Sequence, residues 1–263
     1  MSPLPRLSVT ESVPEPPGPD SPVVVLVHGS LDRAASFARV QRRLGDVHTV
    51  VYDRRGYQGS RQALPLNTTL EGHVDDVLEV VAGRPAVVVG HSYGGDIALG
   101  AALRPDSPVV AVAAYEPPMP WLSVWPRRGP VPGAAPLETD EVAAERFFRR
   151  MVGDSAWDRL SEEGKQSRRA DGPALAAELR AIRLDEAPFD VTTLRVPSVF
   201  GCGGASVGRH RDTVAWLVEH TPGAEWFEIA GASHGAHLTH PDGFAALVRA
   251  TLARAGQPLE PSL

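Results

Sequence analysis

Six short runs of apolar residues, separated by amphipathic segments, constrain the fold of this chain more than any other feature. The runs occupy residues 22–29, 47–53, 86–90, 109–116, 196–202 and 224–231. Continuous apolar runs of this length, rich in valine, are typical of strands that are buried on both faces. Such strands belong to parallel sheets, whose faces are both covered. The pattern therefore predicts an α/β fold with a mostly parallel central sheet.

The segments between these runs complete the prediction. Apolar residues recur at helical spacing in residues 33–44, 69–81, 93–103, 209–219 and 242–253. Helices that connect parallel strands pack against the faces of the sheet. We therefore expect helices on both sides of the central sheet.

One region, residues 117–188, interrupts this alternation because it contains no convincing strand. It begins with the proline-rich stretch PPMPWLSVWPRRGPVPGAAP and continues with charged segments of helical pattern. Proline opposes a helix because its φ is fixed and it lacks the backbone N–H. We therefore predict a helical cap at 117–188, inserted into a core domain formed by 1–116 and 189–263.

Composition narrows the range of partners. The chain has 263 residues, 43% of them hydrophobic and 22% charged, which suits one core-forming domain with an insertion. Its formal net charge is −6, and no cluster of Lys and Arg stands out, so we expect no nucleic-acid partner. The sequence does not determine the oligomeric state, and a homodimer is one of the alternatives.

The sequence also bears on localisation. Residues 1–20 have repeated prolines but no apolar segment of the kind found in signal peptides, and no later run is long enough to span a bilayer. Cys202 is the only cysteine, which excludes an internal disulfide and fits a reducing compartment. We therefore expect a cytoplasmic protein with no membrane partner.

The clearest functional motif is VVVGHSYGGD, where the third apolar run ends and a helical pattern begins. A strand that passes directly into a helix must reverse within a few residues, and the residue at the tip is held in a strained conformation. Gly90 and Gly94 stand two positions on either side of Ser92, where larger side chains would crowd the turn. The motif predicts an exposed Ser92 hydroxyl that can attack a carbonyl group.

A second motif, His28-Gly29-Ser30, ends the first apolar run. An open turn there would present the Ser30 backbone N–H toward Ser92. Together with the Tyr93 N–H, at the start of the following helix, it would form a two-donor oxyanion hole. We interpret His28 and His91 as structural histidines.

A histidine is the expected base, because the imidazole pKa lies near working pH. Of nine histidines, His234 follows the last predicted strand in a loop of small residues, just before the final helix. His237 and His240 share this loop and remain alternatives. His234, His237 and His240 are spaced three residues apart, as metal ligands can be. However, this loop is where the catalytic base is expected. We therefore predict no metal and no cofactor.

The motifs HGS, YDRRGYQGS, GHSYGG and GASHGAHLTHP resemble those of the α/β-hydrolase superfamily and occur in that family's order. The resemblance extends over residues 22–255. It implies an α/β-hydrolase fold with Ser92 as nucleophile, His234 as base, and the N–H groups of Ser30 and Tyr93 as oxyanion hole. Family members that act on haloalkanes or epoxides have an aspartate at the position of Ser92.

The acid of the triad is where the sequence departs from the family pattern. Most relatives place an aspartate in the loop after the strand at 196–202, but this loop reads CGGASVG and has no carboxylate before Asp212. A minority of relatives takes the acid from the end of the preceding strand, where Glu116 stands. The carboxyl edge of a parallel sheet is also where ligands bind. We predict Glu116 as the acid; Asp212, another acid or a dyad without one remain alternatives.

Three further residues have structural interpretations. Asp53 precedes the nucleophile and is assigned to turn stabilisation. Asp96 lies one helical turn after Ser92, where solvation is the simplest interpretation and a bond to backbone or cap is the alternative. Cys202 lacks a positioned partner and is interpreted as a small buried hydrophobic residue.

These features predict an enzyme, a serine hydrolase that cleaves an ester, thioester or lactone of a small apolar substrate through an acyl-enzyme on Ser92. Met119, Trp121 and Trp125 follow Glu116 and are expected to wall a substrate pocket. One alternative is a C–C bond hydrolase or lyase with the same triad, since a fold does not determine the reaction. The other is a non-catalytic ligand-binding member, supported only by the missing loop acid.

Overall fold

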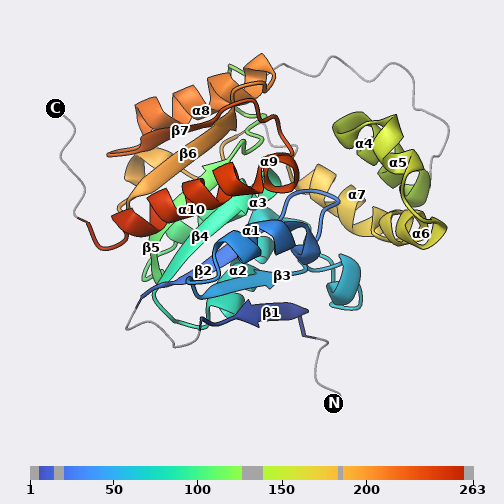
Figure 1. Cartoon of the computed structure of the whole chain (residues 1–263), viewed down its shortest axis with the longest axis horizontal. Coiled ribbons are helices and arrows are strands. Elements are labelled where there is room, and N and C mark those ends of the chain that lie inside the picture. The colour runs from blue at the N-terminus through green and yellow to red at the C-terminus, as the bar shows by residue number, and fades with distance from the viewer. Residues whose placement is uncertain (1–5, 15–20, 126–138, 183–185, 258–263) are drawn as a thin grey trace.

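The computed structural model describes residues 6–14, 21–125, 139–182 and 186–257. Its centre is a seven-stranded sheet of order β1-β3-β2-β4-β5-β6-β7 (Figure 1). The strands are β1 (Val9–Ser12), β2 (Val23–Val27), β3 (Thr49–Tyr52), β4 (Ala86–His91), β5 (Val109–Tyr115), β6 (Ser198–Gly203) and β7 (Glu225–Ile229). All neighbouring strands pair in parallel except β1, which is antiparallel to β3. The predicted mostly parallel sheet, with all six expected strands, is confirmed.

The sequence missed strand β1. All four of its residues are exposed, and it pairs only with β3, matching Val9 with Tyr52 and Ser12 with Thr49. A four-residue edge strand buries little apolar surface, so no continuous apolar run marks it in the sequence.

Five predicted helices pack against the sheet; four of them connect strands, and the fifth follows the last strand. They are α1 (Ala38–Arg43), α2 (Leu70–Val81), α3 (Tyr93–Ala102), α8 (Gly208–His220) and α10 (Pro241–Arg254). Figure 1 shows them stacked against the sheet, with α1 and α10 side by side. Helices α2, α3 and α8 share a core cluster on one face, and α1 and α10 share a cluster on the other.

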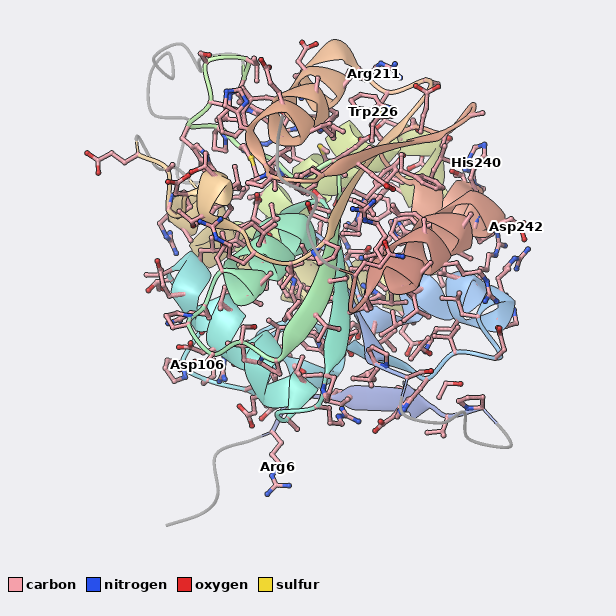
Figure 2. All side chains as sticks on the ribbon, turned by 90° about the vertical axis from the view of Figure 1, so that its left-hand side faces the viewer. Arg6, Asp106, Arg211, Trp226, His240 and Asp242 are labelled. Carbon is pink, nitrogen blue, oxygen red and sulfur yellow. The ribbon has the colours of Figure 1, made fainter. Side chains whose placement is uncertain are left out.

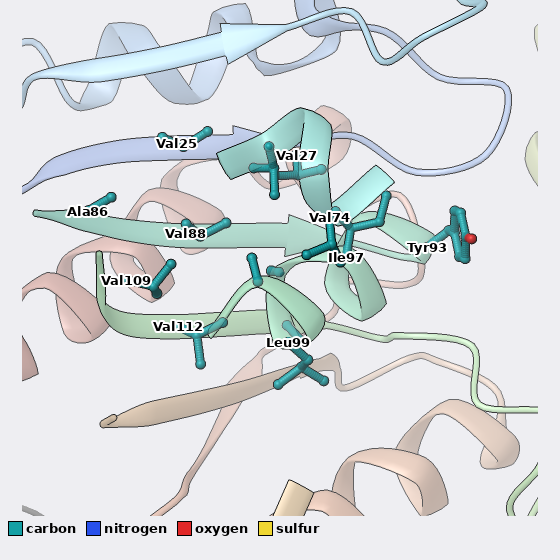
Figure 3. Packing of buried hydrophobic residues seen from close by; sticks show 14 of the residues in the cluster. Val25, Val27, Val74, Ala86, Val88, Tyr93, Ile97, Leu99, Val109 and Val112 are labelled. Carbon is teal, nitrogen blue, oxygen red and sulfur yellow. The ribbon is translucent and has the colours of Figure 1, made fainter. Parts of the chain in front are cut away.

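The core shows why the strands have continuous apolar sequences. Val25, Val27 and Val88 pack with Val74 and Ile97 on one face of the sheet (Figure 3). Their chain neighbours in β2 and β4 point the other way, into the second cluster. Each fully buried valine stabilises the fold by about 1.5–3 kcal/mol relative to an exposed one, so both faces contribute. This packing gives β4 and α3 a rigid base.

Among the residues that the structure describes, four α-helices lie between β5 and β6 in the chain. They are α4 (Asp140–Val152), α5 (Asp154–Asp158), α6 (Glu162–Ala170) and α7 (Gly172–Ala181). Figure 1 shows them grouped beside the sheet rather than on its faces. The hydroxyl oxygens of Thr139 and Ser161 accept hydrogen bonds from the first turns of α4 and α6, which stabilises these helix starts.

These four helices have an apolar cluster of their own. Phe148, Trp157 and Leu175 pack there with Leu31 and Tyr57 from the rest of the chain. We propose that 117–188 is a cap domain on a core of 1–116 and 189–263. Much of the predicted proline-rich linker, residues 126–138, lies outside the described residues. Within the described part of the chain, no helix is both long and apolar enough to cross a membrane.

Candidate active site

Ser92 stands at the junction of β4 and α3 with φ of 53° and ψ of −130°. Positive φ is strained for a residue with a Cβ and persists only where the surroundings enforce it. A Cβ added to Gly90 would lie 1.9 Å from the Gly94 carbonyl oxygen, and one added to Gly94 would lie 2.2 Å from the Val27 oxygen. The backbones therefore approach so closely that only glycine fits, as the sequence predicted for this sharp turn.

Gly90→Ala should disrupt this turn. The added Cβ overlaps backbone atoms, and no side-chain rotation relieves such an overlap. We expect a melting temperature lower by about 5 °C or more, because overpacking costs about 1–3 kcal/mol and sometimes more. Gly45→Ala is the matched control, since its added Cβ has its nearest neighbour at 4.0 Å. Equal melting temperatures for the two variants would contradict the steric argument.

The structure brings together the three residues predicted as a triad. The His234 Nε2 atom lies 3.1 Å from the Ser92 Oγ, and the His234 Nδ1 atom lies 2.8 Å from a Glu116 carboxylate oxygen. Both distances fall in the hydrogen-bonding range. A neutral imidazole that donates from Nδ1 to Glu116 can accept the Ser92 proton at Nε2. This arrangement is suited to activating a serine hydroxyl.

Glu116 directly follows β5 and is fully buried. Its second carboxylate oxygen accepts hydrogen bonds from the Gly203 N–H, at 2.8 Å, and from the Ser206 hydroxyl. Burial raises the pKa of this carboxyl, but the bonds from His234, Ser206 and Gly203 outweigh it and hold the pKa below its usual value. The loop that lacks the expected aspartate thus supplies two donors to a carboxylate from the neighbouring strand.

The alternative acid and bases lie elsewhere. Among the described contacts, no hydrogen bond or ion pair joins Asp212 to His234. His237 is buried and its Nε2 lies 3.0 Å from an Asp32 oxygen. His240 lies at the edge of the molecule near Asp242 (Figure 2), and its ring contacts the Thr239 hydroxyl at 2.9 Å. Of the three histidines in this loop, His234 is the one in contact with Ser92.

Two other histidines support the His234 ring. His91 donates from Nε2 to the His234 carbonyl oxygen at 2.7 Å, which fits its predicted structural role. The His210 ring stacks on the His234 ring, with centroids 4.6 Å apart and planes 18° apart. Sequence reasoning missed His210, because it lies on an ordinary amphipathic helix, α8. Its only sequence signal is its place within one turn of the start of that helix.

The turn at His28 lies against the nucleophile. A Cβ on Gly29 would lie 2.8 Å from the Ser92 Cβ, and the next residue but one, Leu31, has a φ of 53°. His28 is structural as expected: its Nδ1 lies 2.9 Å from the Gly29 oxygen, and its Nε2 accepts from the Arg54 N–H. In the described part of the chain, neither the Ser30 nor the Tyr93 backbone N–H has a hydrogen-bond partner, as a site for an oxyanion requires.

A cavity of about 240 Å³ opens above Ser92. Ser92 and His234 lie in its wall, and most of the remaining wall is apolar. The apolar side chains are Leu31, Phe147, Phe148, Met151, Val152 and Leu238. Four of these come from α4, one of the charged helical segments, which the sequence did not mark as a pocket wall. The signal that could have found them is the recurrence of apolar residues at helical spacing within that charged segment.

The predicted pocket residues are placed elsewhere, and this expectation is corrected. Met119 is fully buried in the core cluster that contains α3. Trp121 packs edge-on against Phe189, with centroids 5.9 Å apart, and Trp125 packs edge-on against His210 at 5.7 Å. None of the three lines the cavity, because after β5 they pack against the core and α8 instead of over Ser92.

The remaining structural interpretations have different outcomes. Asp53 accepts from the Ala34 and Gly59 N–H groups at 2.9 and 3.1 Å, which fits turn stabilisation. Cys202 is buried, and burial raises the pKa of its thiol to about 11. The interpretation of Asp96 as solvated is wrong: it is fully buried, its oxygens have no partner among the described residues, and burial raises its pKa well above its usual value.

Buried neutral histidines make stability depend on pH. Burial lowers the pKa of His28 to about 3 and that of His210 to about 4, and it holds those of His73 and His91 well below their usual value. In the unfolded chain these groups gain protons below about pH 6.5, so the unfolded state binds more protons. We expect the free energy of unfolding to fall from pH 6.5 to 5, by about 1.4 kcal/mol per pH unit for each such histidine at most.

Urea unfolding at pH 7.0, 6.0 and 5.0 measures this dependence. His210→Phe keeps an aromatic ring beside His234 and removes one titrating group, so its stability should fall less steeply with decreasing pH. A free energy of unfolding that is constant from pH 7 to 5 would show that these histidines titrate normally in the folded protein.

Two groups of side chains have donors that metal ions accept, namely Asp32 with His91 and His237, and Glu116 with His210 and His234. In each group the ligand atoms lie within 4.8 Å of one another. In each group, however, the carboxylate already binds a histidine: Glu116 binds His234, and Asp32 binds His237. The hydrogen-bonded triad therefore accounts for the second group without a metal.

Curated hydrolases match parts of this chain. The chain is 36% identical over 101 residues to the uncharacterized hydrolase YraK of Bacillus subtilis, covering 36% of this chain and 37% of that protein. It is 31% identical over 157 residues to epoxide hydrolase A of Mycobacterium tuberculosis, covering 51% and 48%. These matches thus span less than half the length of the curated relatives.

Solved structures match almost the entire chain. The enol-lactonase from Burkholderia xenovorans has a TM-score of 0.72 at 19% identity, covering 94% of this chain and 96% of that one. A lipase-esterase related protein from Clostridium acetobutylicum has a TM-score of 0.71 at 16% identity, covering 94% and 100%. At these identities the likeness establishes the fold. The model of the alpha/beta hydrolase family matches residues 24–247, so the chain belongs to the alpha/beta hydrolase family.

Proposed function

We propose that this protein is a serine hydrolase that cleaves an ester, thioester or lactone of a small apolar substrate. The observation that carries the proposal is the continuous hydrogen-bonded series from Ser92 through His234 to Glu116, at the wall of an apolar cavity. Ser92, rather than an aspartate, stands at the turn after β4. This favours ester chemistry over epoxide opening, despite the partial likeness to epoxide hydrolase A.

In the first half of the reaction, the Ser92 Oγ attacks the substrate carbonyl carbon while His234 Nε2 takes the hydroxyl proton. Glu116 accepts the Nδ1–H, keeps the ring in the required tautomer and stabilises the imidazolium. The negative charge that develops on the carbonyl oxygen is met by the Ser30 and Tyr93 N–H groups. His234 then donates its proton to the departing alkoxide or thiolate, which leaves an acyl group on Ser92.

In the second half, water attacks the acyl carbon and His234 takes a proton from it. Collapse of the second tetrahedral intermediate releases the acid and returns the proton to Ser92. Each half uses the same three side chains and the same two N–H groups. In a lactone the departing alkoxide remains part of the acyl group until water releases the hydroxy acid.

The cavity supports a small acyl group in contact with α4. A volume of about 240 Å³ accommodates a short chain or a single ring, and Phe148 and Met151 lie in its wall. Apolar contacts of this kind discriminate by about 1–3 kcal/mol for each methylene group. The acyl length that the enzyme accepts should therefore depend on the residues of α4.

The proposal is tested with 4-nitrophenyl esters of acetic, butyric and hexanoic acid. For the wild type we expect saturable hydrolysis, lost on heat denaturation. Met151→Trp fills part of the cavity, so the ratio of kcat/KM for hexanoate to that for acetate should fall about 10-fold or more. Trp121→Phe, which alters the residue packed against Phe189, should leave this ratio unchanged.

Two results would contradict this assignment. Absence of turnover for all three esters, together with absence of a covalent adduct, would argue against a serine hydrolase. A change of the acyl-length ratio in Trp121→Phe but not in Met151→Trp would place the acyl group over the loop after β5 instead of beside α4.

A further inference from the structure

Two side chains from the cap hold the turn that contains Ser30. Arg168 of α6 donates a hydrogen bond from its Nη1 to the Leu31 carbonyl oxygen. Glu178 of α7 accepts a hydrogen bond from the Ser30 hydroxyl. The turn that offers one of the proposed oxyanion donors is therefore bound by two helices of the cap.

Glu178 is a cap residue whose carboxylate is inserted among residues of the core. Its side chain is 1% exposed. One oxygen binds the Ser30 hydroxyl, and the other accepts from the Tyr57 hydroxyl at 2.9 Å and from Arg54 Nη2 at 2.8 Å. The same Arg54 nitrogen donates to the Gly29 carbonyl oxygen at 2.9 Å. Glu178 thus reaches the turn both directly and through Arg54.

The network that joins Arg54, Tyr57 and Ser30 depends on Glu178, which comes from the cap. Arg54 is as fully buried as Glu178, and removing one partner of a buried ion pair leaves an uncompensated charge that is strongly destabilising. Leu31 holds a positive φ, which a residue with a side chain keeps only where its surroundings impose it. Arg168 binds the carbonyl oxygen of this residue, and Glu178 binds the hydroxyl of the residue before it.

A second buried carboxylate of the cap, that of Asp171, binds the core at a different place from Glu178. Asp171, at the end of α6, is fully buried and accepts from Arg61 Nη2 at 2.6 Å and from the Gln58 N–H at 3.1 Å. Its other oxygen lies 3.7 Å from Arg33 Nη2. Among the described contacts, none joins Asp171 to residues 28–31. Asp171 therefore anchors the cap without contacting the turn.

We propose that Glu178 is a positioning residue of the oxyanion hole, so that docking of the cap completes the catalytic site. This inference rests on the proposed serine hydrolase function. With Glu178 bound to the Ser30 hydroxyl and Arg54 bound to Gly29, the Ser30 peptide N–H is held toward the developing negative charge. A displacement of about 1 Å can lower a rate about 100-fold, and loss of one donor lowers it about 100- to 1,000-fold.

The test compares Glu178→Gln with Asp171→Asn, two variants that each remove one buried cap carboxylate charge. The first readout is the rate at which a fluorophosphonate labels Ser92, because the phosphoryl oxygen occupies the oxyanion hole. The second is hydrogen exchange of the peptide spanning residues 27–33. We expect Glu178→Gln to slow labelling about 10- to 100-fold and to accelerate exchange in this peptide. Asp171→Asn should remain within about 3-fold of wild type in both readouts.

Ser30→Ala separates positioning from general destabilisation. It removes the hydroxyl link to Glu178 but keeps the contacts of Glu178 with Arg54 and Tyr57. We expect Ser30→Ala to slow labelling while retaining the wild-type melting temperature within a few degrees. In the double variant, the two effects should combine to less than their product, because both substitutions alter the contact between Ser30 and Glu178. Ser30→Ala also tests the idea if Glu178→Gln fails to fold.

The proposal is overturned if Glu178→Gln and Asp171→Asn affect labelling and exchange equally, or if the effects of Ser30→Ala and Glu178→Gln multiply. It is also overturned if Ser30→Ala labels at the wild-type rate. If the wild type forms no adduct but Glu178→Gln alone accelerates exchange at 27–33, the serine hydrolase function fails while the role of Glu178 in holding the turn stands.

Discussion

Ser92→Ala should abolish the covalent adduct that the wild-type protein forms with a fluorophosphonate and lower ester turnover about a million-fold. The wild-type hydroxyl lies 3.1 Å from His234 Nε2, at a turn that exposes it to the cavity. Without this oxygen no acyl-enzyme forms, and only the oxyanion donors and substrate binding remain. In a serine protease of another fold, removing the nucleophile lowers kcat by about 2 × 10⁶.

Intact-mass spectrometry measures the adduct, and heat-denatured wild type provides the control for activation by the fold. Ser233→Ala is the matched variant, because Ser233 is adjacent to His234 in sequence and, among the described contacts, its hydroxyl does not bind the imidazole. We expect a single adduct in the wild type and in Ser233→Ala. An adduct that persists in Ser92→Ala would place the nucleophile elsewhere.

Glu116→Gln should lower kcat by about four orders of magnitude while leaving the fold intact. The amide keeps the size of the side chain, but its NH₂ group cannot accept the Nδ1–H of His234. The imidazole then adopts the wrong tautomer, and the imidazolium loses its counter-charge. Replacement of the orienting aspartate by its amide in a serine protease costs about 10⁴ in kcat through the same effect.

Asp212→Asn is the control, since Asp212 is the other acid considered from the sequence and has no described contact with His234. We expect its kcat and KM to match those of the wild type. Melting temperatures of both variants check that the fold is retained. A near-normal kcat in Glu116→Gln, or a large loss in Asp212→Asn, would assign the orienting role to another residue.

The parts of the fold that could be predicted have local signals. Strands β2 to β6 carry continuous apolar runs because both of their faces are buried, whereas most residues of β7 are exposed or half-buried, contrary to the expectation for that strand. The turn at Ser92 is marked by Gly90 and Gly94, since any Cβ there would meet backbone atoms. His234 and Glu116 were found because each follows a recognisable strand. In all these cases, the physical requirement falls on the residue itself or on its immediate neighbours.

The parts that escaped prediction depend on residues far apart in the chain. Ser206 lies 90 residues from Glu116, the carboxylate that it binds. Ser30 and Glu178 are separated by 148 residues. Hydrogen-bonding side chains such as these have many available partners, so their sequence positions carry no signal of which one they meet. The burial of Asp96 was missed for the same reason, because its position on α3 does not reveal what covers it.

The sequence by itself determined the parallel sheet, the sharp turn at Ser92 and the order of the three residues predicted as a triad. Only the tertiary structure decided that Glu116 receives its support from Gly203 and Ser206, that α4 rather than the loop after β5 walls the cavity, and that Glu178 contacts the turn at Ser30. Backbone conformation and strand burial are set by local sterics and hydrophobicity, whereas the shape and polarity of a cavity arise where separate segments pack together.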